Sequence, residues 1–108
     1  MVKEDVFEKL KKEILEAEGQ VNETLLEIKV EGAYEDVKMA RDYPSSYSEE
    51  YIIKDMERYY SAILNIARFD YGNIGAEGQS SYSADGTSIH YLNRDRYFKG
   101  VYPIGEIQ

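Results

Sequence analysis

Residues 23–42 read ETLLEIKVEGAYEDVKMARD, and this stretch decides the fold. Its apolar residues step by four, three, four and three positions, which is the period of one helix face: Leu26, Val30, Ala33, Val37 and Ala40. We therefore predict an amphipathic helix from about Glu23 to Asp42. Asn22 is the expected N-cap, since its side-chain oxygen can accept from a free backbone amide of the first turn.

Other apolar residues of the same stretch fall outside this stripe. We expect Leu25, Ile28 and Met39 to widen the stripe or to form a second one. Gly32 lies in the middle of the helix, where glycine costs roughly 1 kcal/mol relative to alanine. The prediction is that it allows a close helix crossing.

A shorter helix is predicted before this stretch, from Lys3 to Glu18. Its apolar residues recur at helical spacing: Val6, Phe7, Leu10 and Ile14. Gly19 is the expected stop, because helices often end in a left-handed glycine.

A third helix is predicted after Pro44, whose preceding residue is forced out of helical geometry. Two starts are equally good: Ser46, which has capping-box spacing with Glu49, and Ser48, which is followed by acids. The helix is expected to continue to about Phe69. Its seam consists of Ile53, Met56, Tyr60, Ile63 and Ala67, flanked by Ile52, Tyr59 and Ile66.

The chain changes character after residue 70, where serine, glycine and tyrosine replace most apolar residues. Glycines at 72, 75 and 78 predict a loop, because glycine accepts backbone angles that other residues resist. Residues 82–91 predict a β-hairpin around an Asp85-Gly86 turn. The expected fold is mainly α: a small bundle of three main helices with a C-terminal β-hairpin arm and a short C-terminal turn or helix. It forms a single domain, residues 1–108, with a helical body (1–70), a loop and arm (71–93) and a tail (94–108).

Composition narrows the function. The net charge is −8, so the chain has no basic stripe that could hold nucleic acid. No apolar stretch is long enough to span a bilayer, and the start lacks a signal-peptide core. There is no cysteine, which excludes disulfides and thiolate metal sites.

Catalytic and metal motifs are weak. The glycine loop leaves a helix and is followed by no lysine with serine or threonine, so it is not a phosphate-binding loop. Asp85, Ser88 and His90 are triad residue types, but alternation along a strand would put Asp85 on the opposite face. Glu27, Glu31 and Glu35 follow a four-residue spacing, which favours a solvated helix face over a metal ridge. We therefore expect no enzyme, no cofactor and no metal.

The tyrosines suggest protein interfaces, where this residue is enriched. One group, Tyr43, Tyr47 and Tyr51, clusters at the link into the third helix. A second group, Tyr82, Tyr91, Tyr97 and Tyr102, lies in the C-terminal third, which is expected to find its packing partner on another molecule. The candidate interface residues are Gly75, Glu77, Gly78, Tyr82, Asp85, Gly86, Ile89, Tyr91, Tyr97 and Tyr102.

These residues together resemble a known family, the head–tail connector (adaptor) proteins of long-tailed bacteriophages and prophages. The resemblance covers the whole chain in order and length. It rests on segments of the second and third helices and on the glycine motif: Leu25–Ile28, Ala33–Val37, the Pro44 link, Ile52–Ile53, Ile66–Arg68, Gly75–Gly78, Ser81–Ser83, Asp85-Gly86 and Tyr91. The family usually has an arginine directly before the glycine motif. Here six residues separate Arg68 from Gly75, so no role is carried over to Arg68.

The resemblance implies an architectural role. Copies would assemble into a ring, typically dodecameric, below the portal protein of the capsid. The ring would extend the DNA channel without specific DNA binding and would dock the downstream neck or tail completion protein. The implied location is the virion, after assembly in the host bacterial cytoplasm. The alternative from the residues alone is a small acidic helical adaptor or regulator that binds another, basic protein.

Overall fold

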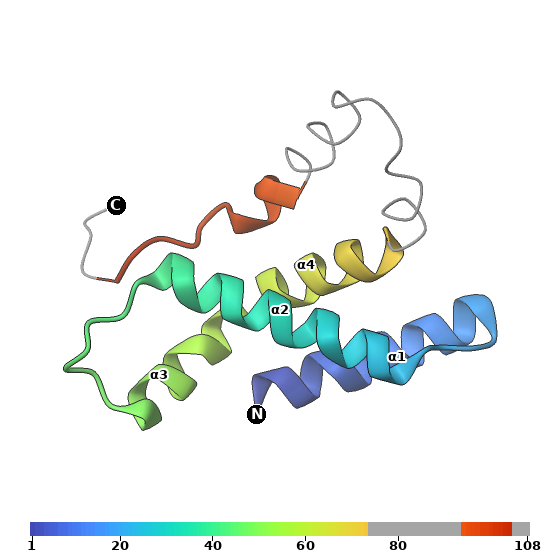
Figure 1. Ribbon diagram of the computed structural model, residues 1–108, viewed down its shortest axis with the longest axis horizontal. Coiled ribbons are helices and arrows are strands. Elements are labelled where there is room, and N and C mark those ends of the chain that lie inside the picture. Colours follow the sequence, from blue (N-terminus) through green and yellow to red (C-terminus); the bar gives the residue numbers. More distant parts are fainter. Residues whose placement is uncertain (74–93, 105–108) are drawn as a thin grey trace.

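The computed structural model of the protein describes residues 1–73 and 94–104 (Figure 1). All regular secondary structure of the described part is helical. Its elements are α1 (Val2–Glu18), α2 (Glu23–Arg41), α3 (Glu49–Met56), the 3₁₀ turn η1 (Glu57–Tyr59), α4 (Tyr60–Gly72) and the 3₁₀ turn η2 (Arg96–Phe98).

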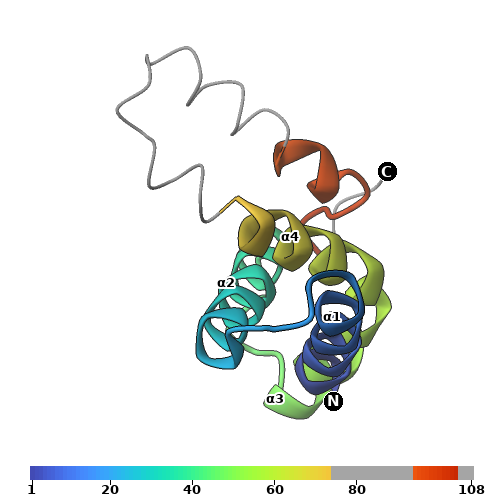
Figure 2. The ribbon, with the colours of Figure 1, turned by 90° about the vertical axis from the view of Figure 1, so that its right-hand side faces the viewer.

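Helix α2 is the centre of the arrangement. It packs along α4 and along α1, and α1 also contacts α4. Figure 1 shows that α2 runs antiparallel to both neighbours, while α3 lies beyond the start of α1. Residues 94–104 cross the side of α2 and α4 that faces away from α1 (Figure 2).

The ends of the helices follow local chemistry. Asn22 accepts a hydrogen bond from the amide of Leu25 at 3.1 Å, which confirms the predicted cap of α2. Ser48 accepts from the amide of Tyr51 at 3.1 Å, so α3 begins at the second of the two predicted starts. Gly19 ends α1 in the left-handed region at φ 79°, as predicted.

The core forms where the predicted stripes meet. Val6, Leu10, Leu26, Val37, Met56, Ile63 and Ile66 are the largest fully buried side chains. Burial of side chains of this kind contributes about 1.5–3 kcal/mol each. The predicted stripes of α1 and α2 are therefore confirmed as parts of the core, in which α2 packs most extensively on α4.

The prediction of one continuous third helix is wrong. A 3₁₀ turn at Glu57–Tyr59 divides it into α3 and α4. The predicted seam had Ile53 in the core and Ile52 at its flank. In the structure Ile52 is buried and Ile53 is half-buried. A straight helix from Glu49 to Gly72 would be about 36 Å long, much longer than α2. The break lets α4 lie along α2 while α3 closes the end of the core.

The predicted fold class also needs correction. Residues 1–73 and 94–104 contain helices and turns but no strand, so a β-hairpin arm is not part of the fold seen here. The residues assigned to the hairpin, 82–91, lie outside the described residues. The signal used for them was an Asp-Gly turn between short alternating segments, which is a local pattern without the packing partner that a two-stranded hairpin needs.

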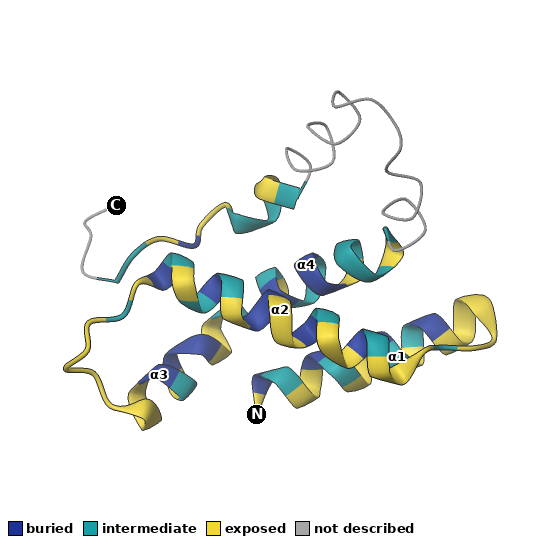
Figure 3. Cartoon of the chain, viewed as in Figure 1, coloured by how far each residue is buried: buried dark blue, intermediate teal, exposed yellow. Residues whose placement is uncertain are grey.

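For the remaining apolar residues of α2, the sequence left two alternatives, a wider core stripe or a second stripe, and the first is wrong for Ile28 and Met39. Ile28 and Met39 do not widen the core stripe, because their side chains are 57% and 75% exposed. Figure 3 shows the buried residues of α2 on one side of the helix and exposed residues on the other. A Cβ added at Gly32 would meet no atom within 4 Å, so this glycine serves no helix crossing within the described chain.

We predict that Gly32→Ala stabilises the monomer by about 0.5–1 kcal/mol, since alanine loses less backbone entropy in a helix. Chemical denaturation followed by circular dichroism measures the change. Gly19→Ala is the matched control: its positive φ disfavours a side chain, so we expect a loss of about 1–2 kcal/mol. A destabilised Gly32→Ala monomer would show that this position is packed in solution.

Candidate interaction surfaces

Most of the predicted interface residues lie outside the described residues: Gly75, Glu77, Gly78, Tyr82, Asp85, Gly86, Ile89 and Tyr91. Tyr97 and Tyr102 are described. Tyr97 is half-buried against the core, with its ring centroid 5.6 Å from that of Phe69. Tyr102 is 42% exposed. The structure therefore offers the Tyr102 side chain to solvent and uses Tyr97 within the chain.

A buried ion pair joins α2 to α3. Arg41, the last residue of α2, donates from Nε at 3.1 Å and from Nη2 at 2.9 Å to Oδ2 of Asp55. Their side chains are only 8% and 5% exposed. The Tyr43 hydroxyl also donates to Oδ2, and Arg58 donates to Oδ1 at 3.0 Å. This carboxylate is thus fully hydrogen-bonded.

These contacts shift the acid–base behaviour of the cluster. Burial alone would raise the pKa of Asp55, but the hydrogen bonds from Tyr43, Arg41 and Arg58 outweigh it and lower the pKa below its ordinary value of 3.8. Burial, with the hydrogen bond to Asp55, raises the pKa of Tyr43. The carboxylate stays charged and the phenol stays protonated at neutral pH.

The same arginine holds part of the C-terminal tail. Nη1 of Arg41 donates to the Tyr102 carbonyl at 2.9 Å, and the amide of Ile104 donates to the Arg41 carbonyl at 2.7 Å. Val101, between the turn η2 and these bonds, is 9% exposed and belongs to the core. Residues 94–104 therefore pack on their own helices, contrary to the expectation that the whole C-terminal third packs on another molecule.

A second arginine fixes the start of this tail. Arg94 donates to both oxygens of Asp70, at 2.8 Å from Nε and 2.9 Å from Nη2. Nη2 also reaches Asp36 of α2 at 2.7 Å. The hydrogen bonds with Asp70 raise the pKa of Arg94. Two carboxylates, from α2 and α4, therefore hold one guanidinium.

The predicted tyrosine cluster at the link is confirmed as a set of ring contacts. The centroids of Tyr47 and Tyr51 are 5.0 Å apart in an edge-to-face arrangement, and those of Tyr43 and Tyr47 are 6.4 Å apart. Tyr47 and Tyr51 remain exposed. Only Tyr43, through its bond to Asp55, belongs to the buried network.

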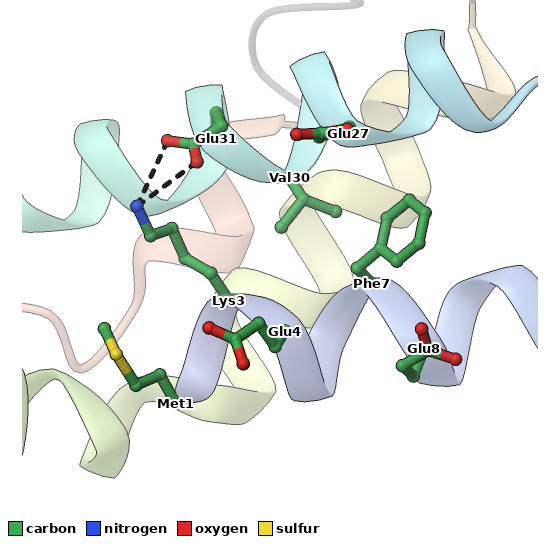
Figure 4. A pocket seen from close by; sticks show the side chains of 8 residues that line it. All are labelled: Met1, Lys3, Glu4, Phe7, Glu8, Glu27, Val30 and Glu31. Atoms are coloured by element: carbon green, nitrogen blue, oxygen red, sulfur yellow. Dashed lines mark hydrogen bonds and ion pairs between the residues drawn. The ribbon is translucent and has the colours of Figure 1, made fainter.

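A groove of about 440 Å³ lies between α1 and α2. Its lining residues are Met1, Lys3, Glu4, Phe7, Glu8, Glu27, Val30 and Glu31. Figure 4 shows Phe7 and Val30 between the two helices, with carboxylates on both sides. Lys3 spans the groove and contacts the two Glu31 carboxylate oxygens at 3.2 and 3.3 Å.

The described residues contain no group of three or more metal-binding side chains. Of the glutamate ridge considered above, Glu31 is paired with Lys3. Ser88, His90 and Asp85 lie outside the described residues. Among the described helices, none is long and apolar enough to cross a membrane.

Comparison of the chain with protein-family models, with curated proteins and with solved structures finds no match.

The sequence interpretation missed the buried ion pair and the groove. Arg41 lies four residues after Val37, and Asp55 lies three residues after Ile52. Each charged residue is therefore on the same helix face as a buried apolar residue. A charged residue at a core position on each of two neighbouring helices is the signal that indicates a buried pair. The groove has no comparable signal, since its two sides are brought together only by the packing of α1 on α2.

We predict that Asp55→Asn lowers the free energy of unfolding by about 3–5 kcal/mol, because it leaves the Arg41 charge buried without a counter-ion. Urea denaturation at pH 7 measures the loss. The double variant Arg41→Met/Asp55→Leu is the control, which removes both charges and should lose less than the single variant. A single variant as stable as the wild type would contradict the buried pair.

The lowered pKa of Asp55 also predicts a pH dependence. A carboxyl whose pKa is lower in the folded state stabilises the fold above its unfolded pKa of 3.8, and this contribution is lost as the pH falls through the folded pKa. Wild-type stability should therefore fall more steeply than that of Asp55→Asn between about pH 5 and pH 2. Parallel curves for the two proteins would contradict the assignment.

Proposed function

We propose that the chain is a structural virion protein, a head–tail connector that assembles into a ring below the portal of a long-tailed bacteriophage or prophage. The ring extends the DNA channel and docks the next neck or tail component. The observation that carries the proposal is the exposure of two large apolar side chains, Ile28 and Met39, on the side of α2 opposite the core.

This face has the character of a contact between subunits. Ile28 and Met39 are eleven residues apart, close to three turns, so their side chains lie on the same side of α2. Gly32 lies between them and leaves room for a close approach. A small helical body that buries one face of α2 and exposes large apolar side chains on the other supports assembly with a further molecule. A head-to-tail contact of this kind repeats until a ring closes.

The charge supports a channel role. An acidic surface repels phosphates, so DNA can pass along it without being held. With a net charge of −8, the chain suits a channel wall better than a DNA-binding protein. The resemblance of the sequence to connector proteins gives the partners: further copies in a dodecameric ring, the portal and the downstream completion protein. It also gives the location, the neck of the virion, after assembly in the host bacterial cytoplasm.

The first test uses the portal itself. We expect the purified protein, mixed with the portal protein of the same genome, to form annular complexes visible by negative-stain microscopy. A protein that is monomeric when alone would be compatible with this role, since the portal can supply the template. No co-assembly with the correct portal would contradict the proposal.

The second test addresses the α2 face. Ile28→Ser/Met39→Ser should reduce assembly on the portal at least about tenfold, since each apolar side chain buried at an interface contributes about 1.5–3 kcal/mol. The monomer should keep its helical signal, because both side chains are exposed. The control Ile28→Val/Met39→Leu keeps the face apolar and should assemble. Equal assembly of both variants would show that this face is not part of the interface.

A further inference from the structure

We propose that the groove between α1 and α2 binds a cationic amphipathic helix of a partner protein. The helix would place an apolar side chain on Phe7 and basic side chains beside the surrounding glutamates. The groove lies on the α1 side of α2, whereas Ile28 and Met39 lie on its outward face. The inference therefore stands whether or not the chain forms a ring.

The floor of the groove is apolar. Val30 is 3% exposed and belongs to the core beneath the groove, whereas Phe7 is half-buried and keeps surface that a partner can contact; both lie between the helices (Figure 4). The volume of about 440 Å³ is within the range of small-molecule sites, so the groove can admit side chains of a partner helix but not the whole helix. An apolar side chain of a partner can therefore exchange water for contact with the accessible surface of Phe7.

Glutamates line both sides of the groove, and on each side they recur after one helical turn. Glu4 and Glu8 lie four residues apart on α1, and Glu27 and Glu31 lie four residues apart on α2, which is a rise of about 6 Å in each case. A helix that lies in a groove presents its side chains at the same spacing. Lysines or arginines one turn apart would thus meet carboxylates on either side.

The rim carboxylates also lack partners of their own. Glu31 is paired with Lys3, but Glu4, Glu8 and Glu27 make no ion pair or hydrogen bond within the part of the chain that the structure describes. Other glutamates of the same helices are paired: Glu13 with Arg68 and Glu23 with Lys11. Three unpaired carboxylates therefore lie beside the groove, while Asp5, Glu16, Glu18 and Glu35 are unpaired elsewhere on the same two helices of the described chain.

This charge pattern favours a basic partner over a second copy. The chain carries a net charge of −8, so a second copy brings excess negative charge to an acidic rim. The described arginines that pack against acids, Arg41, Arg68 and Arg94, are already used within the chain. The excess of acid over base in the chain therefore favours a basic protein over a second copy.

The test uses synthetic helix-forming peptides as probes of the full chain. The first peptide carries leucines at positions i, i+4 and i+7 with lysines on both flanks. The second replaces the lysines by glutamates, and the third replaces the leucines by serines. We expect the first to bind and to shift the ¹³C methyl signals of Val30, the second not to bind, and the third to bind at least about tenfold more weakly.

Two variants with the same net charge locate the site. Glu8→Lys/Glu27→Lys reverses two rim charges, whereas Glu16→Lys/Glu35→Lys reverses two exposed charges on the same helices outside the groove. The rim variant should bind the leucine–lysine peptide at least about tenfold more weakly, and the control less than about twofold. Glu8→Gln/Glu27→Gln gives an intermediate loss and serves as a second measurement should the lysine variant not fold.

Three outcomes would overturn the proposal. Equal losses in the rim and control variants would show bulk attraction to an acidic protein. Peptide-induced shifts at Ile28 and Met39 in place of Val30 would move the site to the outward face of α2. Shifts at Val30 that follow the protein concentration alone would show that a second copy fills the groove. Failure of ring assembly on the portal would contradict the proposed ring but not the binding of a basic helix in the groove.

Discussion

The buried contact between Arg41 and Asp55 holds the described parts of the chain in register. It lies where α2 ends, it reaches across to α3, and it binds the tail through the Tyr102 carbonyl. A buried ion pair is seldom more stabilising than well-packed apolar residues would be. Its effect is positional: two helices and the tail must all be in place before the charges are satisfied. Among the described residues no buried side-chain nitrogen or oxygen is left without a partner, so this condition is met.

The elements set by local chemistry could be predicted from the sequence. The period of the stripe from Leu26 to Val37, the amide-binding side chains of Asn22 and Ser48, and the left-handed Gly19 act within a few residues of where they stand. The break between α3 and α4 could not be predicted in this way. Neither glycine nor proline occurs in residues 56–60, and the turn there follows from how α4 must lie along α2.

Among the candidate surfaces, too, the sequence predicts the local contacts but not those between distant residues. The tyrosine contacts at the link were predictable, because residues 43, 47 and 51 are close in sequence. The docking of residues 94–104 was not, since it needs Arg94 to meet carboxylates of both α2 and α4, and Arg41 to meet a carbonyl 61 residues away. Because apolar residues are sparse in the C-terminal third, the sequence predicted that this segment does not pack on the helices. Arginine pairs and the single buried Val101 provide that place for the tail.

The distribution of paired charge connects the fold with the proposed roles. Lys3, Lys11, Arg41, Arg58, Arg68 and Arg94 all contact carboxylates of the same chain. A phosphate would have to displace these carboxylates before it contacted any of these six of the thirteen basic side chains. The excess acid stays on the surface, where it repels DNA and attracts basic protein segments. One charge pattern thus supports both a channel through which DNA passes and a groove that selects a cationic partner.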